Sequence, residues 1–385
     1  MRISAGKPRL GIIALNRAIP YLLKLVDTAA TGSSGVGGIE VQVLALARAL
    51  AARGWPVTLL VADWGQPDGP LEVDGMTVIK AHRRGSSALA AVQLANSLRR
   101  VPVDIWLLQG IHGAAGVASF VAHATGRRFV FWLASDTDAM CTDPAKSRLP
   151  RSQRRLAAYG LRTADALVAQ TNHQCELVRE RLRREATVIP NAWPVDALKP
   201  GRAGKPTALW VANLRWEKRP EMVLELAQAA PEIQFLMVGG PMSGNERLHE
   251  DILARQHDYD NFQYLGFVPF EHVGRHFETA DVFINTSVVE GFPNTFLQAW
   301  DAQLPIVASF DPDDTLKREA LGYHAEAVEP FAEHLRALMA DEALRRSLGA
   351  RGKQYLRDNF SMEVVIPRLE ALLTDVAAGR HSSQT

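Results

Sequence analysis

The sequence has little of the features that mark several large protein classes. Its 385 residues include only two cysteines, Cys141 and Cys175, so no disulfide framework is expected and a reducing compartment fits. No apolar run reaches the length of a membrane-spanning helix. Basic and acidic residues nearly balance at 43 and 42, giving a net charge of +1, which argues against a dedicated nucleic-acid-binding protein.

The N-terminal segment lacks the features of an export signal. Residues 1–15, MRISAGKPRLGIIAL, have too short an apolar core and no clean cleavage site. We interpret residues 10–15 as a buried first strand and expect a cytoplasmic protein. The chain is long enough for two domains with a large core.

Several catalytic motifs are also missing. No set of His, Cys and acidic residues has metal-ligand spacing, and neither a G-x-S-x-G turn nor a Walker sequence occurs. The glycines of residues 31–40, TGSSGVGGIE, do not match G-x-G-x-x-G, which disfavours a nicotinamide site. We therefore expect no metal ion and no cofactor.

What the sequence does contain is an alternation of apolar strands and helical patterns, typical of parallel α/β sheets. In the first half the expected strands are 10–15, 57–62, 76–79, 105–108, 129–133, 166–170 and 187–189. In the second half they are 207–214, 235–238, 262–267, 281–284 and 306–308. The sequence predicts two Rossmann-like parallel-sheet domains.

The expected domain boundaries follow from composition. Residues 1–190 form the first domain, and the proline- and glycine-rich stretch 191–206 suits a linker. Residues 207–361 form the second domain. An amphipathic helix begins near Met362, and residues 362–385 end in a frayed tail.

One stretch, residues 284–300 (INTSVVEGFPNTFLQAW), concentrates the polar groups of the second half. A strand leads to Glu290 and Gly291, and a helix is expected to begin near Asn294. A helix start attracts phosphate, while a carboxylate accepts hydrogen bonds from hydroxyl groups. Gln298 lies one turn after Asn294 on the same helix face, so its amide can point toward the same crevice.

The neighbouring strand ends of the second half supply complementary groups. Cationic side chains follow its first strand, glycine turns follow the next two, and all are expected at one edge of a parallel sheet. Cations and a helix N-terminus suit a diphosphate, whereas glycine turns and apolar side chains suit a flat base. The residues concerned are Arg215, Lys218, Arg219, Gly239, Gly240, Phe267 and Val268.

The first half offers weaker candidates at its strand ends. His112, Asp136 and Asp138 each follow a predicted strand. The alternative is a structural role as a helix cap or turn group, which is the better interpretation for Asp138 and equally good for the other two. Gly37 and Gly38 either let the backbone approach a ligand or belong to a connector, and spacing favours neither.

Two basic clusters, residues 146–155 and 179–184, allow two interpretations. The default is a solvated helix face. The alternative is peripheral contact with the anionic inner face of a membrane.

At this point the sequence resembles the retaining glycosyltransferases of family 4, also called glycosyl transferases group 1, which have the two-domain GT-B fold. The matching motifs cover most of both halves in the right order, and the second half matches best. They are residues 37–60 (GGIEVQVLALARALAARGWPVTLL), 188–193 (VIPNAW), 211–227 (VANLRWEKRPEMVLELA), 236–241 (LMVGGP), 264–269 (YLGFVP) and 287–309 (SVVEGFPNTFLQAWDAQLPIVAS).

The resemblance implies two Rossmann-like domains facing across a cleft. The first lies on the acceptor side, the second binds a nucleotide-diphosphate sugar, and the last helix crosses back to the first. It implies metal-independent transfer of a sugar to a glycan or lipid-linked acceptor in polysaccharide biosynthesis, with no nucleic-acid partner.

The resemblance also implies residue roles. Lys218 would bind the donor diphosphate, Glu290 would contact the donor sugar, and Gln298 would stand at the ribose. Asp136 would orient the acceptor, with His112 a weaker acceptor contact. The remaining donor-site residues would be Gly37, Gly38, Arg215, Gly239, Phe267, Val268, Gly291, Phe292, Pro293, Asn294 and Thr295.

The sequence departs from the family pattern at three places. Gln298 replaces a glutamate, Asn213 stands where many relatives have an arginine, and Leu133 or Ala134 occupies the place of a histidine. Two alternatives to a transferase therefore stay open. They are a noncatalytic nucleotide-sugar-binding protein and a GT-B nucleotide-sugar epimerase.

Overall fold

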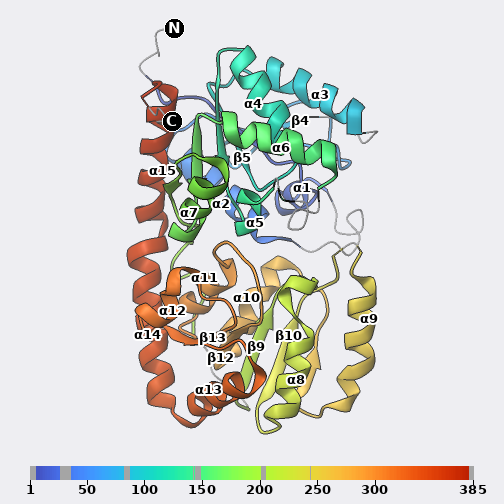
Figure 1. Cartoon of the computed structure of the whole chain (residues 1–385), viewed down its shortest axis with the longest axis vertical. Helices are drawn as coiled ribbons and strands as arrows, with labels where there is room; N and C mark the ends of the chain where they lie inside the picture. Colours follow the sequence, from blue (N-terminus) through green and yellow to red (C-terminus); the bar gives the residue numbers. More distant parts are fainter. Residues whose placement is uncertain are drawn as a thin grey trace. The chain divides into compact units, whose positions relative to one another are not determined.

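The computed structural model describes residues 6–26, 36–81, 87–141, 143, 149–200, 205–242 and 244–380. These residues form two compact units, each with its own sheet (Figure 1). Among the described residues, unit 1 consists of 6–26, 38–192 and 362–380, and unit 2 of 36–37 and 193–361. The fold class is therefore two parallel-sheet α/β units, as the alternating pattern predicts.

The sheet of unit 1 has the order β3-β4-β2-β1-β5-β6-β7-β8. Every pairing is parallel except that of the edge strand β3 with β4. The strands are β1 (Leu10–Ile13), β2 (Val57–Val61), β3 (Leu71–Val73), β4 (Met76–Lys80), β5 (Ile105–Gln109), β6 (Arg128–Trp132), β7 (Ala166–Ala169) and β8 (Thr187–Val188). The central strands are buried on both faces, which explains their continuous apolar runs.

Helices cover both faces of this sheet, because each face has its own apolar cluster. Residues of α1, α2 and α15 pack on one face, and residues of α3, α4, α6 and α7 on the other. The helices are α1 (Ala18–Leu22), α2 (Gly38–Ala52), α3 (Ser87–Arg100), α4 (Ala114–Ala124), α5 (Asp136–Ala139), α6 (Arg151–Thr163), α7 (Asn172–Leu182) and α15 (Met362–Ala377).

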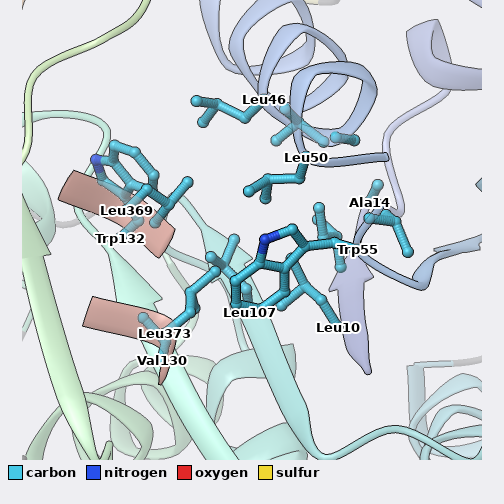
Figure 2. Close-up of a cluster of buried hydrophobic side chains, with 14 of the residues drawn as sticks. Leu10, Ala14, Leu46, Leu50, Trp55, Leu107, Val130, Trp132, Leu369 and Leu373 are labelled. Atoms are coloured by element: carbon cyan, nitrogen blue, oxygen red, sulfur yellow. The ribbon is translucent and has the colours of Figure 1, made fainter. Parts of the chain in front are cut away.

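The C-terminal helix α15 belongs to unit 1 although it follows unit 2 in the sequence. Its Leu369 and Leu373 are almost fully buried and point toward Trp132 and Val130 of β6 (Figure 2). At its exposed side, Glu370 accepts hydrogen bonds from Lys7 at 2.7 Å and from Trp55 at 2.6 Å. The helix is thus part of the core of unit 1 rather than an appendage.

The sheet of unit 2 has the order β11-β10-β9-β12-β13-β14, with every pairing parallel. In chain order this is 3-2-1-4-5-6, the doubly wound Rossmann order. The strands are β9 (Thr207–Val211), β10 (Gln234–Val238), β11 (Phe262–Tyr264), β12 (Val282–Asn285), β13 (Ile306–Ala308) and β14 (Gly322–His324).

The helices of unit 2 include short and long ones. They are η2 (Trp216–Lys218), α8 (Glu221–Ala229), α9 (Glu246–Arg255), η3 (Gln256–Asp258), α10 (Phe270–Thr279), α11 (Asn294–Asp301), η4 (Pro312–Asp314), α12 (Thr315–Arg318), α13 (Val328–Ala340) and α14 (Glu342–Phe360).

The segment after unit 1 is held against unit 2 by the last residue of α11. Asp301 is fully buried and accepts hydrogen bonds from the Trp193 indole at 3.1 Å and from the backbone N–H groups of Asp196 and Leu198 at 2.8 Å each. Lys353 of α14 forms an ion pair with the same carboxylate. Much of the proline-rich stretch expected as a linker is therefore bound to unit 2.

The expected strands agree with the structure to within a few residues, with two differences. The strand expected at 262–267 ends at Tyr264, because Gly266 has a φ of +68° that turns the chain. The edge strands β3 and β14 were not expected, because three-residue strands carry too few apolar positions to show a period.

Candidate functional site

The polar strand ends of unit 2 meet where the strand order reverses. Strands β9 and β12 are neighbours in the sheet but are separated in the chain by β10 and β11. Ligands of doubly wound sheets bind outside the carboxyl ends of the strands at this point. Lys218 follows β9 and Glu290 follows β12, so both predicted residues lie at the carboxyl ends of these two strands.

Lys218 and Glu290 contact each other directly. The Lys218 Nζ donates to Glu290 Oε1 in an ion pair, and the Ser287 hydroxyl donates to the same oxygen at 2.8 Å. The two side chains are 18% and 15% exposed, so the pair is sheltered without being sealed from solvent. A cation and a carboxylate are therefore held side by side, whereas the sequence predicts only that both lie at one edge of the sheet.

A buried threonine holds the backbone beneath this pair. The Thr286 hydroxyl donates to the carbonyl oxygens of Lys218 and Arg219, at 2.6 and 3.0 Å, and accepts from the Trp210 indole at 2.9 Å. Thr286 is fully buried, so these bonds are not exchanged with water. The loops after β9 and β12 are thereby joined under the ion pair.

Arg219 differs from the expectation that it contributes to an anion site. Its φ of +43° turns the chain, and its guanidinium donates to Thr286 O at 3.1 Å, Ser309 Oγ at 3.2 Å and Glu326 O at 3.1 Å. These groups follow β12, β13 and β14. Arg219 therefore fastens the strand ends to one another, whereas the Lys218 ammonium group pairs with Glu290.

The other predicted cation and the departure at residue 213 lie beside β9. The Arg215 guanidinium is 3.7 Å from Glu217 Oε1, a long and half-exposed pairing. The Asn213 amide donates to the carbonyl of Val36 at 3.2 Å. Gly37, the next residue, is thus close to the β9 end of unit 2, whereas Gly38 begins α2 of unit 1.

The glycine turn after β10 packs against the backbone of β9. A Cβ atom on Gly239, whose φ is +152°, would lie 1.7 Å from the carbonyl oxygen of Ala212. The Gly239 carbonyl accepts a hydrogen bond from the Tyr264 hydroxyl at 2.8 Å, and His249 Nδ1 is 2.8 Å from the same hydroxyl. The turn is therefore fixed by steric fit and by a side-chain network.

Apolar groups border this turn. Phe267 lies against Gly240, where a Cβ would be 2.9 Å from the Phe267 Cβ, and its side chain is 40% exposed. Val268 is half-buried. An exposed aromatic residue next to a glycine turn suits contact with a flat ring.

The stretch after Glu290 forms the start of α11. Gly291, Phe292 and Pro293 are buried, and the predicted helix begins at Asn294 with Thr295 next to it. The first N–H groups of a helix carry partial positive charge and lack helical partners. The Phe292 side chain faces the core, 4.7 Å from the Phe360 ring centroid.

Gln298 lies on α11 and is 7% exposed. An amide can donate and accept at the same position, whereas the glutamate expected from the resemblance only accepts when ionised. Its role at a ribose is not tested by the geometry of unit 2 alone and stays a prediction.

In unit 1, His112 and Asp136 lie at the carboxyl ends of β5 and β6. His112 Nδ1 accepts a hydrogen bond from the N–H of Ala114 at 3.2 Å, at the start of α4. Asp136 begins α5, is 6% exposed, and its Oδ2 is 3.9 Å from Nε2 of His173. The strands β1 and β5 enclose the order reversal of this sheet, so His112 is at the corresponding strand end.

Asp138 has the structural role preferred from the sequence. It completes a capping box with Ser135 at the start of α5, and its Oδ2 accepts from the Ala134 N–H at 2.7 Å. Burial raises the pKa of the Asp138 carboxyl from 3.8 to about 7, and burial lowers the pKa of His112 from 6.5 to about 4.

Sequence reasoning missed the supporting residues Trp210 and Thr286 and the fastening role of Arg219. The only available signal was position, because Thr286 follows the strand that leads to Glu290. Within the described part of the chain, no cluster of His, Cys, Asp and Glu has the arrangement of a metal site. Nor does any described helix combine the length and apolarity needed to span a bilayer.

Comparison with known proteins finds distant relatives. One is 2-deoxystreptamine N-acetyl-D-glucosaminyltransferase of Streptomyces fradiae, 28% identical over 70% of this chain and 74% of that protein. Another is glycosyltransferase 1 domain-containing protein 1 of Xenopus tropicalis, 22% identical over 43% of this chain. The chain spans 49% of that protein's length and 24% of the exopolysaccharide phosphotransferase of Streptomyces coelicolor, with which it is 28% identical.

Solved structures share the fold at low sequence identity. Sucrose-phosphate synthase from Thermosynechococcus elongatus matches with a TM-score of 0.78 and 18% identity, over 97% of this chain and 100% of that one. HepE of Anabaena, solved with UDP and glucose, matches with a TM-score of 0.72 and 13% identity, over 95% and 99%. These matches agree with the GT-B fold expected from the sequence.

Two family models account for most of the chain. The model for Glycosyltransferase Family 4 matches residues 36–196, and the model for Glycosyl transferases group 1 matches residues 198–355. The first coincides with most of unit 1 and the second with most of unit 2. Because both models match in the expected order and the fold agrees, the chain belongs to the family 4 glycosyltransferases of group 1.

Proposed function

We propose that this protein is a retaining glycosyltransferase that moves a sugar from a nucleotide-diphosphate sugar to a glycan or lipid-linked glycan acceptor. The observation that supports it best is the contact of Lys218 with Glu290 at the order reversal of the unit 2 sheet. A cation for a diphosphate and an acceptor for sugar hydroxyls are side by side there, next to the start of α11.

The proposed chemistry follows from charge. The acceptor oxygen forms a bond to the anomeric carbon while the bond from that carbon to the diphosphate oxygen breaks. Negative charge develops on the diphosphate, which Lys218 and the N-terminus of α11 stabilise. The acceptor proton passes to the leaving diphosphate on the same face of the sugar, so no protein base is needed and configuration is retained.

The network beneath the ion pair supports this proposal. Preorganised charges are effective because they need not rearrange as the reaction proceeds. The Thr286 hydroxyl donates to the Lys218 carbonyl, and Arg219 in turn donates to the Thr286 carbonyl, so the loop that carries the cation is held at the sheet edge. The Ser287 hydroxyl donates directly to the Glu290 carboxylate and so helps to hold that side chain.

The first donor class to test is a UDP-sugar. HepE of Anabaena has been solved with UDP and with UDP-glucose, and it shares this fold. Gly239, Phe267 and Val268 would border the base, Gln298 the ribose, and residues 291–295 the phosphates. In unit 1, Asp136 would orient the acceptor, with His112 a second contact.

The proposal is tested first by thermal shift with UDP, GDP and ADP. A ligand that binds only the folded state raises the midpoint, by an amount that grows with its concentration over its Kd. The nucleotide that stabilises the protein then defines the sugar donors for incubation with and without glycan acceptors. Product analysis distinguishes transfer from other outcomes.

Three outcomes separate the functions. Transfer to an acceptor with the anomeric configuration of the donor supports the proposal. Nucleotide binding without turnover of any donor would indicate a noncatalytic binding protein, and an isomerised donor would indicate an epimerase. If Lys218→Ala and Glu290→Ala both bind the nucleotide donor as tightly as the unchanged protein, the proposed donor site is wrong.

A further inference from the structure

Three neighbouring helices of unit 1 carry arginines and exposed apolar side chains. Helices α3, α4 and α6 pack side by side on one face of the sheet (Figure 1). None of their sequences contains Asp or Glu, although the whole chain has 42 acidic residues. Their arginines are Arg99, Arg100, Arg151, Arg154, Arg155 and Arg162.

The same surface exposes large apolar side chains. Phe120 of α4 is 63% exposed, and Val92 of α3 is 59% exposed. Leu156 and Tyr159 of α6, one turn apart on the outer face, are each 42% exposed. A soluble surface rarely gathers such residues, so large exposed apolar side chains on the same three helices as the arginines indicate a binding surface.

The packing of α4 and α6 holds these side chains together. A Cβ atom on Gly116 would lie 2.3 Å from the Leu156 carbonyl oxygen, so the two helices approach closely. Ser119, next to Phe120, has its hydroxyl 2.7 Å from that of Thr163, which in turn donates to the Tyr159 carbonyl. Phe120 therefore lies beside the C-terminal half of α6, near Tyr159.

The second basic cluster of the sequence, at the end of α7, differs from this surface. Its Arg179 forms a two-point ion pair with Glu185, at 2.9 and 2.8 Å, and α7 also carries Glu176 and Glu180. At the border of the α3–α4–α6 surface, Asp165 is paired with Arg128 and His123. Helices α3 and α6 thus carry arginines with no acid in their own sequences, whereas α7 carries both signs.

We propose that the α3–α4–α6 surface binds an anionic lipid bilayer. Arginine side chains meet headgroup phosphates, and Phe120, Leu156 and Tyr159 enter the interface between headgroups and acyl chains. A second copy of the chain on the same surface would bring arginines against arginines across a two-fold axis. The surface stands independently of the proposed sugar transfer, because it involves no donor-site residue.

The test is sedimentation of the full-length protein with vesicles of phosphatidylcholine alone and of phosphatidylcholine with phosphatidylglycerol. We expect binding only to the second, weakened by added salt. Arg155→Glu/Arg162→Glu and Phe120→Ser/Tyr159→Ser each lower the partition coefficient, the first by roughly tenfold or more. The matched control is Arg181→Glu/Arg351→Glu, which changes the same net charge at exposed positions elsewhere.

Folding is checked separately by the melting temperature of each variant and by its nucleotide thermal shift, neither of which requires vesicles. The proposal is overturned if the protein does not bind anionic vesicles. It is also overturned if Arg181→Glu/Arg351→Glu lowers the partition coefficient as much as Arg155→Glu/Arg162→Glu does. It is also overturned if Phe120→Ser/Tyr159→Ser abolishes a dimer in sedimentation velocity while vesicle binding is unchanged. In that case a second copy occupies the surface.

Discussion

The two units have related sheets, yet their ligand-side edges differ in how polar groups are used. In unit 2, Lys218 and Glu290 face each other across the order reversal, and backbone groups support them from below. In unit 1, Asp138 and His112 accept hydrogen bonds from the backbone of their own turns. Related topology thus provides equivalent positions, and the described residues of unit 2 place a lysine against a glutamate there, whereas Asp138 and His112 of unit 1 bond to backbone N–H groups.

The largest expected effect is on the unit 2 edge. Lys218→Ala removes the cation proposed at the diphosphate, so kcat with the best donor should fall by about 10²–10³-fold. Lys317→Ala, at an exposed position of α12, is the matched control and should leave kcat unchanged. Steady-state kinetics with the donor found by thermal shift measure kcat for both variants. Equal kcat values for Lys218→Ala and Lys317→Ala would contradict the role proposed for Lys218.

The glycine turns of the two units allow a direct comparison of stability. Gly239→Ala places a Cβ against the Ala212 backbone and should lower the free energy of unfolding by at least about 3 kcal/mol. Gly110→Ala, after β5 of unit 1, comes closest to the flexible end of Ile39 at 2.9 Å, with Ala134 at an ordinary contact distance of 3.6 Å, and should cost roughly 1–2 kcal/mol for its φ of +81°. Urea denaturation measures both, and a reversed order would show that the unit 2 turn adapts.

The support beneath Lys218 should matter more than a similar hydroxyl in unit 1. Thr286→Val leaves the Trp210 indole and two carbonyls without their buried partner, which should cost about 1–3 kcal/mol and reduce kcat as well. Thr125→Val removes a hydroxyl that bonds to helix carbonyls at the end of α4 and should change neither kcat nor donor affinity. Equal activity of both variants would show that Thr286 does not position Lys218.

The smallest effect concerns the pH dependence of unit 1. Because the folded pKa of Asp138 is raised to about 7, its contribution to stability is present below pH 3.8 and is lost as pH rises through 7. The folded pKa of His112 is lowered to about 4, so its contribution is lost as pH falls from 6.5 to 4. The two dependences oppose each other over this window.

Urea denaturation at several pH values between 4 and 7 separates the two groups. We compare the free energy of unfolding of each variant with that of the unchanged protein at the same pH. This difference should shift in favour of Asp138→Asn as pH rises, and in favour of His112→Gln as pH falls. Glu180→Gln, at an exposed position of α7, serves as the control for loss of an acid. The same slope for both variants would contradict the assignment of opposite shifts.

Most of the fold could be predicted because buried parallel strands leave long apolar runs in the sequence. The same reasoning placed Lys218 and Glu290 at one edge, since each follows a strand of one parallel sheet. It did not separate Lys218 from Arg219, which have the same charge and are adjacent. Their roles differ because the left-handed turn at Arg219 directs its guanidinium toward backbone carbonyls.

The buried Asp301 was also beyond sequence reasoning. An acid at the end of an amphipathic helix usually faces water, and its partners Trp193 and Lys353 are distant in the chain. Likewise, the return of α15 to unit 1 was expected only from the resemblance. Periodicity shows that a helix has an apolar face but not which sheet that face meets.

The place of α15 has a practical consequence for dissecting the molecule. In a fragment ending at Ala192, Leu46, Leu50 and Trp132 would lose the apolar side chains of α15 that pack with them and would be exposed to water. Such a truncation is expected to aggregate, because its missing piece is encoded almost 170 residues downstream. Joining residues 362–380 to Ala192 through a glycine–serine spacer would let α15 cover this apolar face again. We expect the resulting protein to fold as unit 1 alone.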